Sequence, residues 1–545
     1  MDNKTKDWQL YEAGKRYNNS LKPNYYSTID TNIAFFNDDQ WRNVEANGMP
    51  TPVFNIIKRV IMFFVASLTS SKVKINLEPL AYSDDAQNPD VQAAKMATSE
   101  IDNLFEKFKM ENRIRDACFD AAIIGDVAAH LYFDVNKKPY GGAFGDVKGE
   151  ICFELVDGSS VFLGNANNPS IEVQPYVIVQ GRDMVRNLKE EAKEYKLSQM
   201  EVENITSDKD YNYQAGDMGK VEVEVNDIEG DEYGKATYII VYKKDRKTGT
   251  IKASKCTETA YMYKDIDTGL IHYPVAWFPW EKQKNQYHGK ALSTGMIPNQ
   301  IFINKMFAMV MYHLMMSAFP KAVYDGDKIE DWTNEIGEAI ELHDLNPGES
   351  VGNLATYLKA GDMSNQIVQV IELAIQYTKE TLGINDAMLG NINPDQASGK
   401  SIIATVQQSS VPLENPKANL YEWIEDIGRI VLDMIGTYYG YRPIVVNENN
   451  MKRIEYFDFS TFKNMWLNVK CDVGASSYWS EIASVETLDN LLQQGLIDII
   501  DYLETIPDGY INQKEELIEK LKIRKEQEAQ AMAMQQAPPI EPPIM

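Results

Sequence analysis

The stretch Gly399-Lys400-Ser401 comes nearest to a catalytic motif, because it matches the end of the phosphate-binding loop of nucleotide hydrolases. That loop needs a second glycine five residues earlier, so that a ring of backbone N–H groups can surround the phosphates. Pro394 stands at that position. Asp433, in Ile430-Val-Leu-Asp433, could pass for the acidic residue that binds Mg²⁺, but it lies in a run of apolar residues with helical spacing. The sequence therefore disfavours an ATPase, and Ser398 or Gly399 is better explained as the start of a helix.

Other reactive residue types also lack the spacing that chemistry requires. Ala291-Leu-Ser-Thr-Gly295 resembles a nucleophile elbow, yet the preceding Gln286-Tyr-His-Gly289 is typical of a loop, whereas an elbow follows a strand. The histidines form no HExxH pair: His130, His272, His288, His313 and His343. The cysteines are far apart and are predicted to be reduced thiols in or near cores: Cys118, Cys152, Cys256 and Cys471. We therefore expect no enzyme activity, no cofactor and no metal site.

The charge balance excludes a protein that simply coats nucleic acid. The chain has 545 residues, with 54 Lys and Arg against 80 Asp and Glu, and a net charge of −26. Affinity for phosphates comes mainly from basic side chains, so this chain repels DNA on average. Its 44% hydrophobic and 25% charged residues are typical of a globular protein, and its length suggests about three to four domains.

Two apolar stretches raise the question of a membrane. Residues 53–68 are interrupted by Lys58 and Arg59, and residues 297–319 contain Asn304, Lys305 and His313. Neither provides the 18 or more nearly charge-free residues of a membrane span, so both are interpreted as buried or interface helices. The first residues lack an apolar core, so no signal peptide is expected.

Hydrophobic spacing predicts a chain that mixes helices and strands. In the first half it predicts a helix over 55–68, a strand at 72–77, helical structure over 91–130, strands over 130–182 and a hairpin after 236–242. Residues 201–235 hold eleven Asp or Glu and three Lys or Arg, which favours a solvated acidic loop.

The second half contains two predicted helices of similar length around a small insert. The first covers 298–318, with Pro298 in its first turn, and the second covers 363–382. A β-like insert, residues 320–361, lies between them. The remaining expectations are a polar loop at 384–398, a helix from 399 to 440 kinked at Pro412, strands over 441–475 and helices over 478–530.

Three segments then follow one another in an order typical of one family. The first is Phe35-Phe-Asn-Asp-Asp-Gln-Trp41, with an Asn55-led helix and a strand at 74–79 after it. The second is Tyr287-His-Gly289 followed by residues 298–305, and the third runs from Gly383 through Ser401. In order and spacing these segments resemble the portal proteins of tailed bacteriophages, the head-to-tail connectors.

The resemblance implies an α+β fold with a mixed α/β wing, paired long stem helices, a small β-rich clip and a helical C-terminal crown. The implied divisions are these: N-terminal arm and wing 1–290, first stem helix 291–318, clip 319–362, second stem helix 363–383, tunnel loop 384–398, kinked wing helix and following strands 399–477, crown 478–530, and a disordered tail 531–545.

The resemblance also implies a function. Portal proteins form a ring, usually of twelve subunits, at one capsid vertex of the virion, after assembly in the host cytoplasm. Double-stranded DNA is packaged and ejected through the ring. The implied partners are other copies of the chain, the terminase large subunit, a head–tail adaptor or neck protein, and the major capsid and scaffolding proteins, with no membrane. The alternatives are a P-loop-like ATPase or nuclease of the packaging machinery, and an unrelated structural or scaffold protein.

The expected site residues fall into three groups. DNA-facing tunnel residues are Asn385, Asn391, Asn393, Gln396 and Lys400. Stem-packing residues are Met306, Met309, Val310 and Leu314. Partner-facing clip residues are Lys321, Asp325, Asp327 and Trp332. The physical reasons are that a helix apolar on all sides is usually buried, here between subunits, and that neutral amides contact phosphates only weakly.

Overall fold

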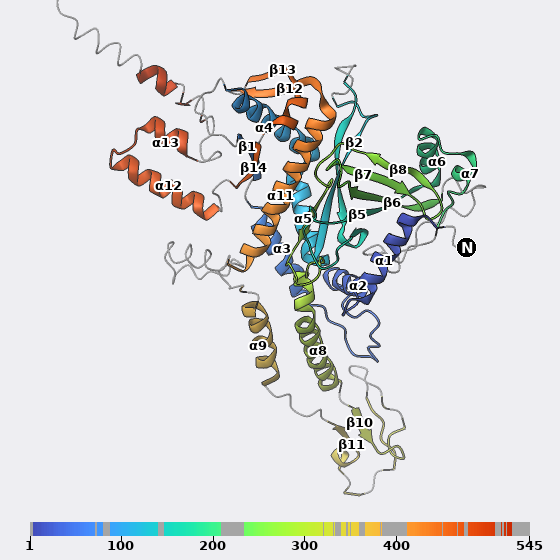
Figure 1. The fold of residues 1–545 in the computed structure, drawn as a ribbon. Coiled ribbons are helices and arrows are strands. Elements are labelled where there is room, and N and C mark those ends of the chain that lie inside the picture. Colours follow the sequence, from blue (N-terminus) through green and yellow to red (C-terminus); the bar gives the residue numbers. More distant parts are fainter. Residues whose placement is uncertain are drawn as a thin grey trace, which may run out of the picture.

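The computed structural model shows a broad body of helices and sheets from which a pair of helices projects (Figure 1). It describes residues 4–70, 73–79, 88–139, 147–208, 234–319, most of 321–358, 366–381 and 383, 411–448, 451–473 except 466, 478–506, and short pieces of 514–525. The fold is a mixture of helices and antiparallel sheets, so the α+β class is confirmed.

Five helices build the N-terminal part of the body: α1 (Lys6–Ser20), α2 (Tyr25–Phe36), α3 (Ile56–Leu68), α4 (Pro89–Phe108) and α5 (Met110–Ile124). Helix α3 begins where the sequence predicts, because the Asn55 side chain accepts a hydrogen bond from the Lys58 N–H at 2.9 Å. Its apolar face lies in the main core, as expected of this stretch. The helical region predicted for 91–130 is instead two helices, divided at Lys109 with φ of 54°, and a strand that starts at Asp126.

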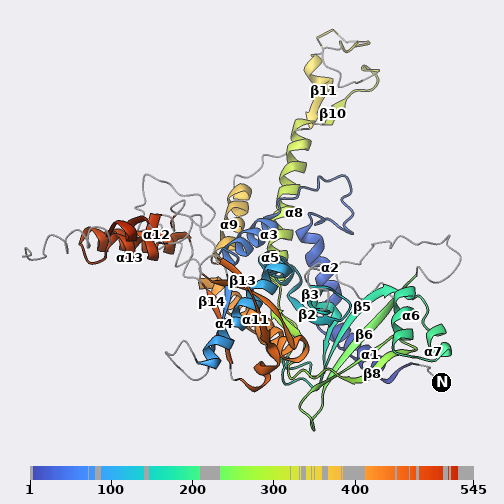
Figure 2. The same ribbon diagram turned by 90° about the horizontal axis from the view of Figure 1, so that it is seen from above.

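Two sheets form the remainder of the body. The three-stranded sheet has the order β3 (Glu150–Asp157), β2 (Asp126–Asp134), β9 (Val275–Pro279). The five-stranded sheet has the order β4 (Val161–Leu163), β5 (Tyr176–Met184), β6 (Lys235–Lys244), β7 (Ile251–Cys256), β8 (Tyr261–Asp267). Helix α1 packs Trp8 and Tyr11 against this second sheet, and α6 (Val185–Glu194) and α7 (Gln199–Glu203) lie beside it (Figure 2). The predicted acidic loop therefore begins within α7, and residues 209–233 lie outside the described part of the chain.

The C-terminal half returns to this body. Helix α11 (Glu414–Met434) buries Trp423 against β9 and ends in a π-turn (Ile435–Tyr439). A hairpin follows, β12 (Tyr441–Glu448) and β13 (Met451–Asp458), and then β14 (Leu467–Val473) pairs antiparallel with β1 (Val73–Pro79). Helices α12 (Tyr478–Gln493) and α13 (Ile499–Thr505) lie to one side of the body (Figure 2). Short 3-10 segments are Gly158–Ser160, Val351–Asn353, Val411–Leu413 and Phe459–Asn464.

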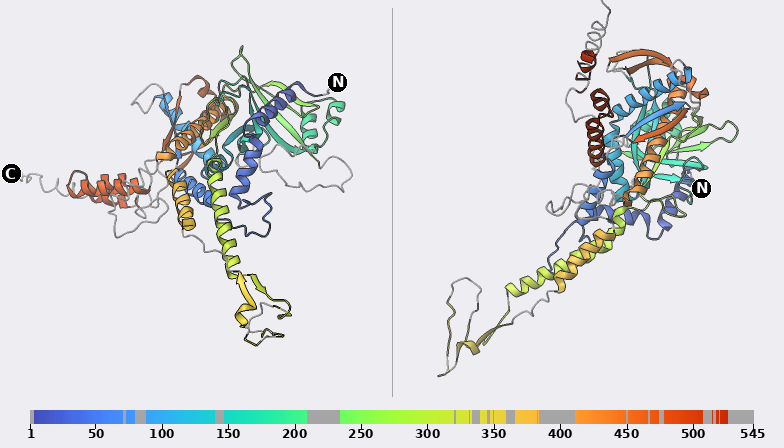
Figure 3. Two further views of the ribbon diagram at one scale, coloured as in Figure 1. Left: turned by 90° about the horizontal axis from the view of Figure 1, so that it is seen from below. Right: turned by 90° about the vertical axis from the view of Figure 1, so that its left-hand side faces the viewer.

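The projection consists of two helices and a small sheet. Helix α8 (Leu292–Ala318) leads away from the body to β10 (Lys321–Tyr324), and β11 (Ala355–Leu358) leads back to α9 (Gln366–Thr381). Helices α8 and α9 lie side by side and run in opposite directions (Figures 1 and 3). Strands β10 and β11 pair antiparallel, with Lys321 opposite Leu358.

Candidate assembly interface in the stem and clip

Helix α8 begins six residues earlier than the sequence predicts, so the expectation that Pro298 lies in the first turn is wrong. The added turns are held by tertiary contacts. The Ser293 hydroxyl donates to the Ile123 carbonyl at 2.9 Å, and the Asn32 amide donates to the Thr294 hydroxyl at 2.9 Å. These bonds stabilise the first turns of α8. Pro298 lacks a backbone N–H and does not by itself determine where the helix begins.

The half of α8 that lies away from the body is apolar and exposed. Met309 is 51% exposed, Leu314 is 56% exposed, and Phe319 just beyond the helix is 73% exposed. Among the described residues, this helix is the one long and apolar enough to cross a membrane, judged by length and composition, and only 17% of its most apolar stretch is buried within the chain. Met306 and Val310 are partly covered. The apolar surface of α8 is therefore largely left for another molecule to cover.

Helix α9 presents a second exposed apolar face. Its buried residues are Ile371 and Thr378. Val370, Leu373 and Tyr377 recur by three and four residues and are 42%, 44% and 60% exposed. The projection thus has two uncovered helix faces.

A network of amide side chains, three buried and one half-buried, anchors α8 in the body, and we call it the stem-root network: Gln40, Asn55, Gln300 and Asn304. Gln40 and the half-buried Asn55 are linked because both donate to the Phe35 carbonyl. Gln300 accepts from the Ile56 N–H at 3.0 Å and donates to the Phe54 carbonyl at 2.8 Å and to Asn304 Oδ1 at 2.9 Å. Asn304 donates to Gln40 Oε1 at 2.6 Å. The Asn55 amide donates to the Phe35 carbonyl at 2.9 Å.

The stem-root network joins pieces that are far apart in the sequence. Gln300 and Asn304 are each 2% exposed and Gln40 is 7% exposed, so each unmade bond there would be costly. All four side chains belong to the first two of the three sequence segments that resemble portal proteins.

The sheet of β10 and β11, which is the expected clip, has a small aromatic cluster. Trp332 stacks on Tyr324 with ring centres 5.5 Å apart and meets Tyr357 edge-on at 5.8 Å. Trp332 is half-buried and packs against this sheet. Lys321, Asp325 and Asp327 are exposed, although the Asp325 carboxylate also accepts from the Asp327 N–H at 3.1 Å. These three remain candidates for partner contacts.

The expected tunnel residues lie outside the described part of the chain: Asn385, Asn391, Asn393, Gln396 and Lys400. The same holds for Pro394 and the Gly399-Lys400-Ser401 stretch. Asp433 lies in a helix, as its spacing predicts, and its carboxylate accepts from the backbone N–H groups of Ile271 and His272 at 2.7 and 2.9 Å. Ser293 is in the first turn of α8 and is buried, so the elbow geometry is not formed. No group of three potential metal ligands occurs among the described residues.

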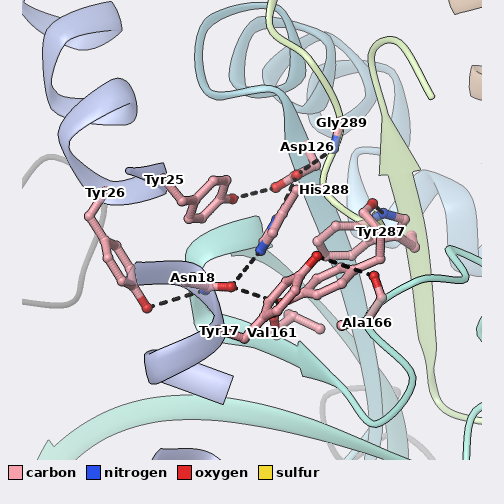
Figure 4. A network of polar contacts seen from close by, with 11 residues as sticks. Tyr17, Asn18, Tyr25, Tyr26, Asp126, Val161, Ala166, Tyr287, His288 and Gly289 are labelled. Atoms are coloured by element: carbon pink, nitrogen blue, oxygen red, sulfur yellow. Dashed lines mark hydrogen bonds and ion pairs between the residues drawn. The ribbon is translucent and has the colours of Figure 1, made fainter. Parts of the chain in front are cut away.

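One buried polar network was not foreseen from the sequence (Figure 4). The Asp126 carboxylate accepts from the Tyr25 hydroxyl at 2.8 Å and from the Gly289 N–H at 2.9 Å, and contacts His288 Nδ1 at 3.0 Å. The other ring nitrogen of His288 contacts the Asn18 amide oxygen at 2.9 Å. Burial raises the pKa of Tyr25 well above its ordinary value, which keeps its hydroxyl protonated as a donor.

This Asp–His pair does not form a catalytic triad. Asn18 occupies the position that a nucleophile would need, and His288 is 2% exposed. The pair instead joins α1, α2 and β2 to the loop that enters α8. The signal in the sequence is Tyr287-His-Gly289, where a Cβ on Gly289 would lie 2.3 Å from the Gly125 carbonyl oxygen.

A comparison with known protein families identifies the family to which this chain belongs. The model of the phage P22-like portal protein family matches residues 180–542, which include α8, β10, β11 and α9. The chain belongs to the phage P22-like portal protein family. No curated protein matches it. It is therefore a phage portal protein, a component of the virion at the capsid, and its family is generally structural.

The family match includes two of the three segments on which the resemblance rests. The segments around Tyr287 and Gly383 lie inside the match, whereas the Phe35 segment precedes it. The match also includes the acidic residues 201–235 and most of the C-terminal region, which no motif had placed.

Proposed function

We propose that the chain forms a closed ring of twelve copies at one capsid vertex and that double-stranded DNA is packaged and ejected through this ring. In this assignment α8 and α9 are the paired stem helices, β10 and β11 belong to the clip, and the body from α1 to β9 with α11 is the wing. Helices α12 and α13 begin the crown.

The observation that carries the proposal is the uncovered apolar surface of the projection. A monomer rarely exposes large contiguous apolar patches, and such patches usually mark interfaces. Met309, Leu314 and Phe319 are each at least half exposed, and all three lie beyond the residues through which the stem-root network anchors α8 to the body. Packing against neighbouring copies covers these side chains without unfolding the wing.

The charge balance supports a channel in which DNA slides. A net charge of −26 prevents tight binding of phosphates. The proposed tunnel loop, residues 384–398, carries Asn385, Asn391, Asn393 and Gln396 but no Lys or Arg before Lys400. Amide side chains make contacts with phosphates that are weak enough to release.

The clip is the proposed docking platform. Its exposed Lys321, Asp325 and Asp327 offer charges of both signs at the far end of the projection (Figure 1). We assign this end to the terminase large subunit during packaging and to the neck or head–tail adaptor protein afterwards. The opposite end would face the scaffolding and major capsid proteins.

Mass measurement of the purified chain tests the ring. Light scattering should give a mass many times that of one chain. Met309→Asp and Leu314→Asp should each give smaller species, because a buried unpaired carboxylate costs several kcal/mol per interface. Met200→Asp is the matched control, since Met200 is 76% exposed on α7, far from the projection. A wild-type chain that remains monomeric at micromolar concentration would refute the proposal.

A further inference from the structure

Helix α8 carries a single ionic side chain. In its 27 residues there is no Asp, Glu or Arg, and the one lysine is Lys305. Lys305 is exposed, and none of the ion pairs among the described residues includes it. The exposed apolar side chains beside Lys305 must be covered by another molecule. The presence of a single charge among them therefore requires an explanation.

Lys305 lies at one end of a regular row. Lys305, Met309, Tyr312, Met316 and Phe319 follow one another by four, three, four and three residues, and all five are exposed. This is the spacing of a seam along which two helices pack. The row begins near the middle of α8 with a positive charge and continues toward β10 as uncharged, mainly apolar side chains.

Helix α9 has a matching row. Gln366, Val370, Leu373, Tyr377 and Glu380 have the same spacing, and all five are exposed. Because α9 runs opposite to α8, the row ends with Glu380 at the wing end. The Gln376 amide donates to Glu380 Oε1 at 2.8 Å and so orients this carboxylate.

The two rows are complementary when they are placed antiparallel. Lys305 then lies opposite Glu380, Met309 opposite Tyr377, and Tyr312 opposite Leu373. Within one chain α9 buries a different face, which contains Ile371 and Thr378. The exposed Val370, Leu373 and Tyr377 of the α9 row lie outside this buried face and are accessible to a second molecule.

We infer that Lys305 of one copy forms an ion pair with Glu380 of the next copy and that this pair fixes the register of the stem helices around the ring. The inference rests on the proposed ring. The occupant of the α8 row is thus a second copy of this chain, and the argument is the complementarity of charge and spacing. A register slip of one turn would move Lys305 against apolar side chains, which disfavours misaligned neighbours.

Charge reversal tests the pair in the full-length chain. Lys305→Glu and Glu380→Lys should each weaken every interface about tenfold, since like charges then face each other. Native mass spectrometry should show incomplete rings at low salt for both. The double variant Lys305→Glu/Glu380→Lys should restore rings of wild-type mass. Lys247→Glu, in the exposed turn between β6 and β7, is the charge-matched control.

Mixing the two single variants gives the sharpest result. Each interface in a mixed ring regains an opposite-charge pair only if the two variants alternate. Co-expression should therefore restore rings that contain the two chains in equal numbers. If single variants form rings as stable as wild type, or if neither the double variant nor the mixture recovers, the pair is refuted. If the wild type forms no ring, the proposed function itself fails.

Discussion

Replacing Gln300 by methionine tests whether the stem-root network holds the stem on the wing. Methionine has nearly the shape of glutamine but cannot replace its hydrogen bonds. The substitution removes the acceptor for the Ile56 N–H and the donors for the Phe54 carbonyl and Asn304 Oδ1. Each buried polar group left without a partner costs about 1–3 kcal/mol, and relaxation with better apolar packing offsets part of this. We expect a net loss of about 3 kcal/mol in the local opening free energy.

Amide hydrogen exchange measures this loss directly. A loss of about 3 kcal/mol corresponds to roughly hundredfold faster exchange. The effect should be confined to peptides that cover Ile56 and the start of α8. Gln369→Met, on the exposed surface of α9, is the matched control and should exchange as the wild type does. Unchanged protection at Ile56 in the Gln300 variant would show that the network does not anchor the stem.

Two further predictions concern the wing and the proposed tunnel loop. Burial raises the pKa of Glu100 from 4.5 to about 7, so folding binds a proton there and stability falls as pH rises from about 4.5 to about 7. Glu100→Gln should therefore melt higher than wild type at pH 8, by an amount equivalent to about 3 kcal/mol, with the difference vanishing below pH 4.5; equal melting temperatures at pH 8 would contradict this. Deleting residues 391–396 should leave rings intact in electron micrographs while the heads package DNA poorly or lose it. Normal DNA content in virions with the deletion would make the loop a simple connection.

Many helices, strands and turns were predicted from the local sequence, because each of them is determined by residues close to it in the chain. Asn55 caps α3, and the turn between β6 and β7 places Gly249 at a φ of +74°. The predicted helix at 363–382 is present as α9, and the part of the predicted helix that follows Pro412 is present as α11. Each of these features follows from capping, turn chemistry or helical spacing.

Features that depend on distant residues were missed. The start of α8 depends on Ile123 and Asn32, which lie far away in the chain. The Asp126–His288 pair requires two positions separated by 162 residues to meet in the core. The sequence of α1 is largely polar, yet the helix buries Trp8 and Tyr11 against a sheet whose strands lie much later in the chain. Periodicity indicates which face of an element is buried, but it does not identify the partner.

The pairing of β1 with β14 has a consequence for the time course of synthesis. Val73 lies opposite Val473, so this strand pair cannot form until nearly the whole chain has left the ribosome. Contacts this distant in sequence form slowly. Helix α8 ends at Ala318, and β14 begins at Leu467. At about 5–20 residues per second, roughly 7–30 s pass between the synthesis of α8 and the synthesis of β14. During that interval the nascent chain exposes the apolar side chains of α8 while its core is still open. We therefore expect the nascent chain to bind chaperones, and the proposed ring to close only after release from the ribosome.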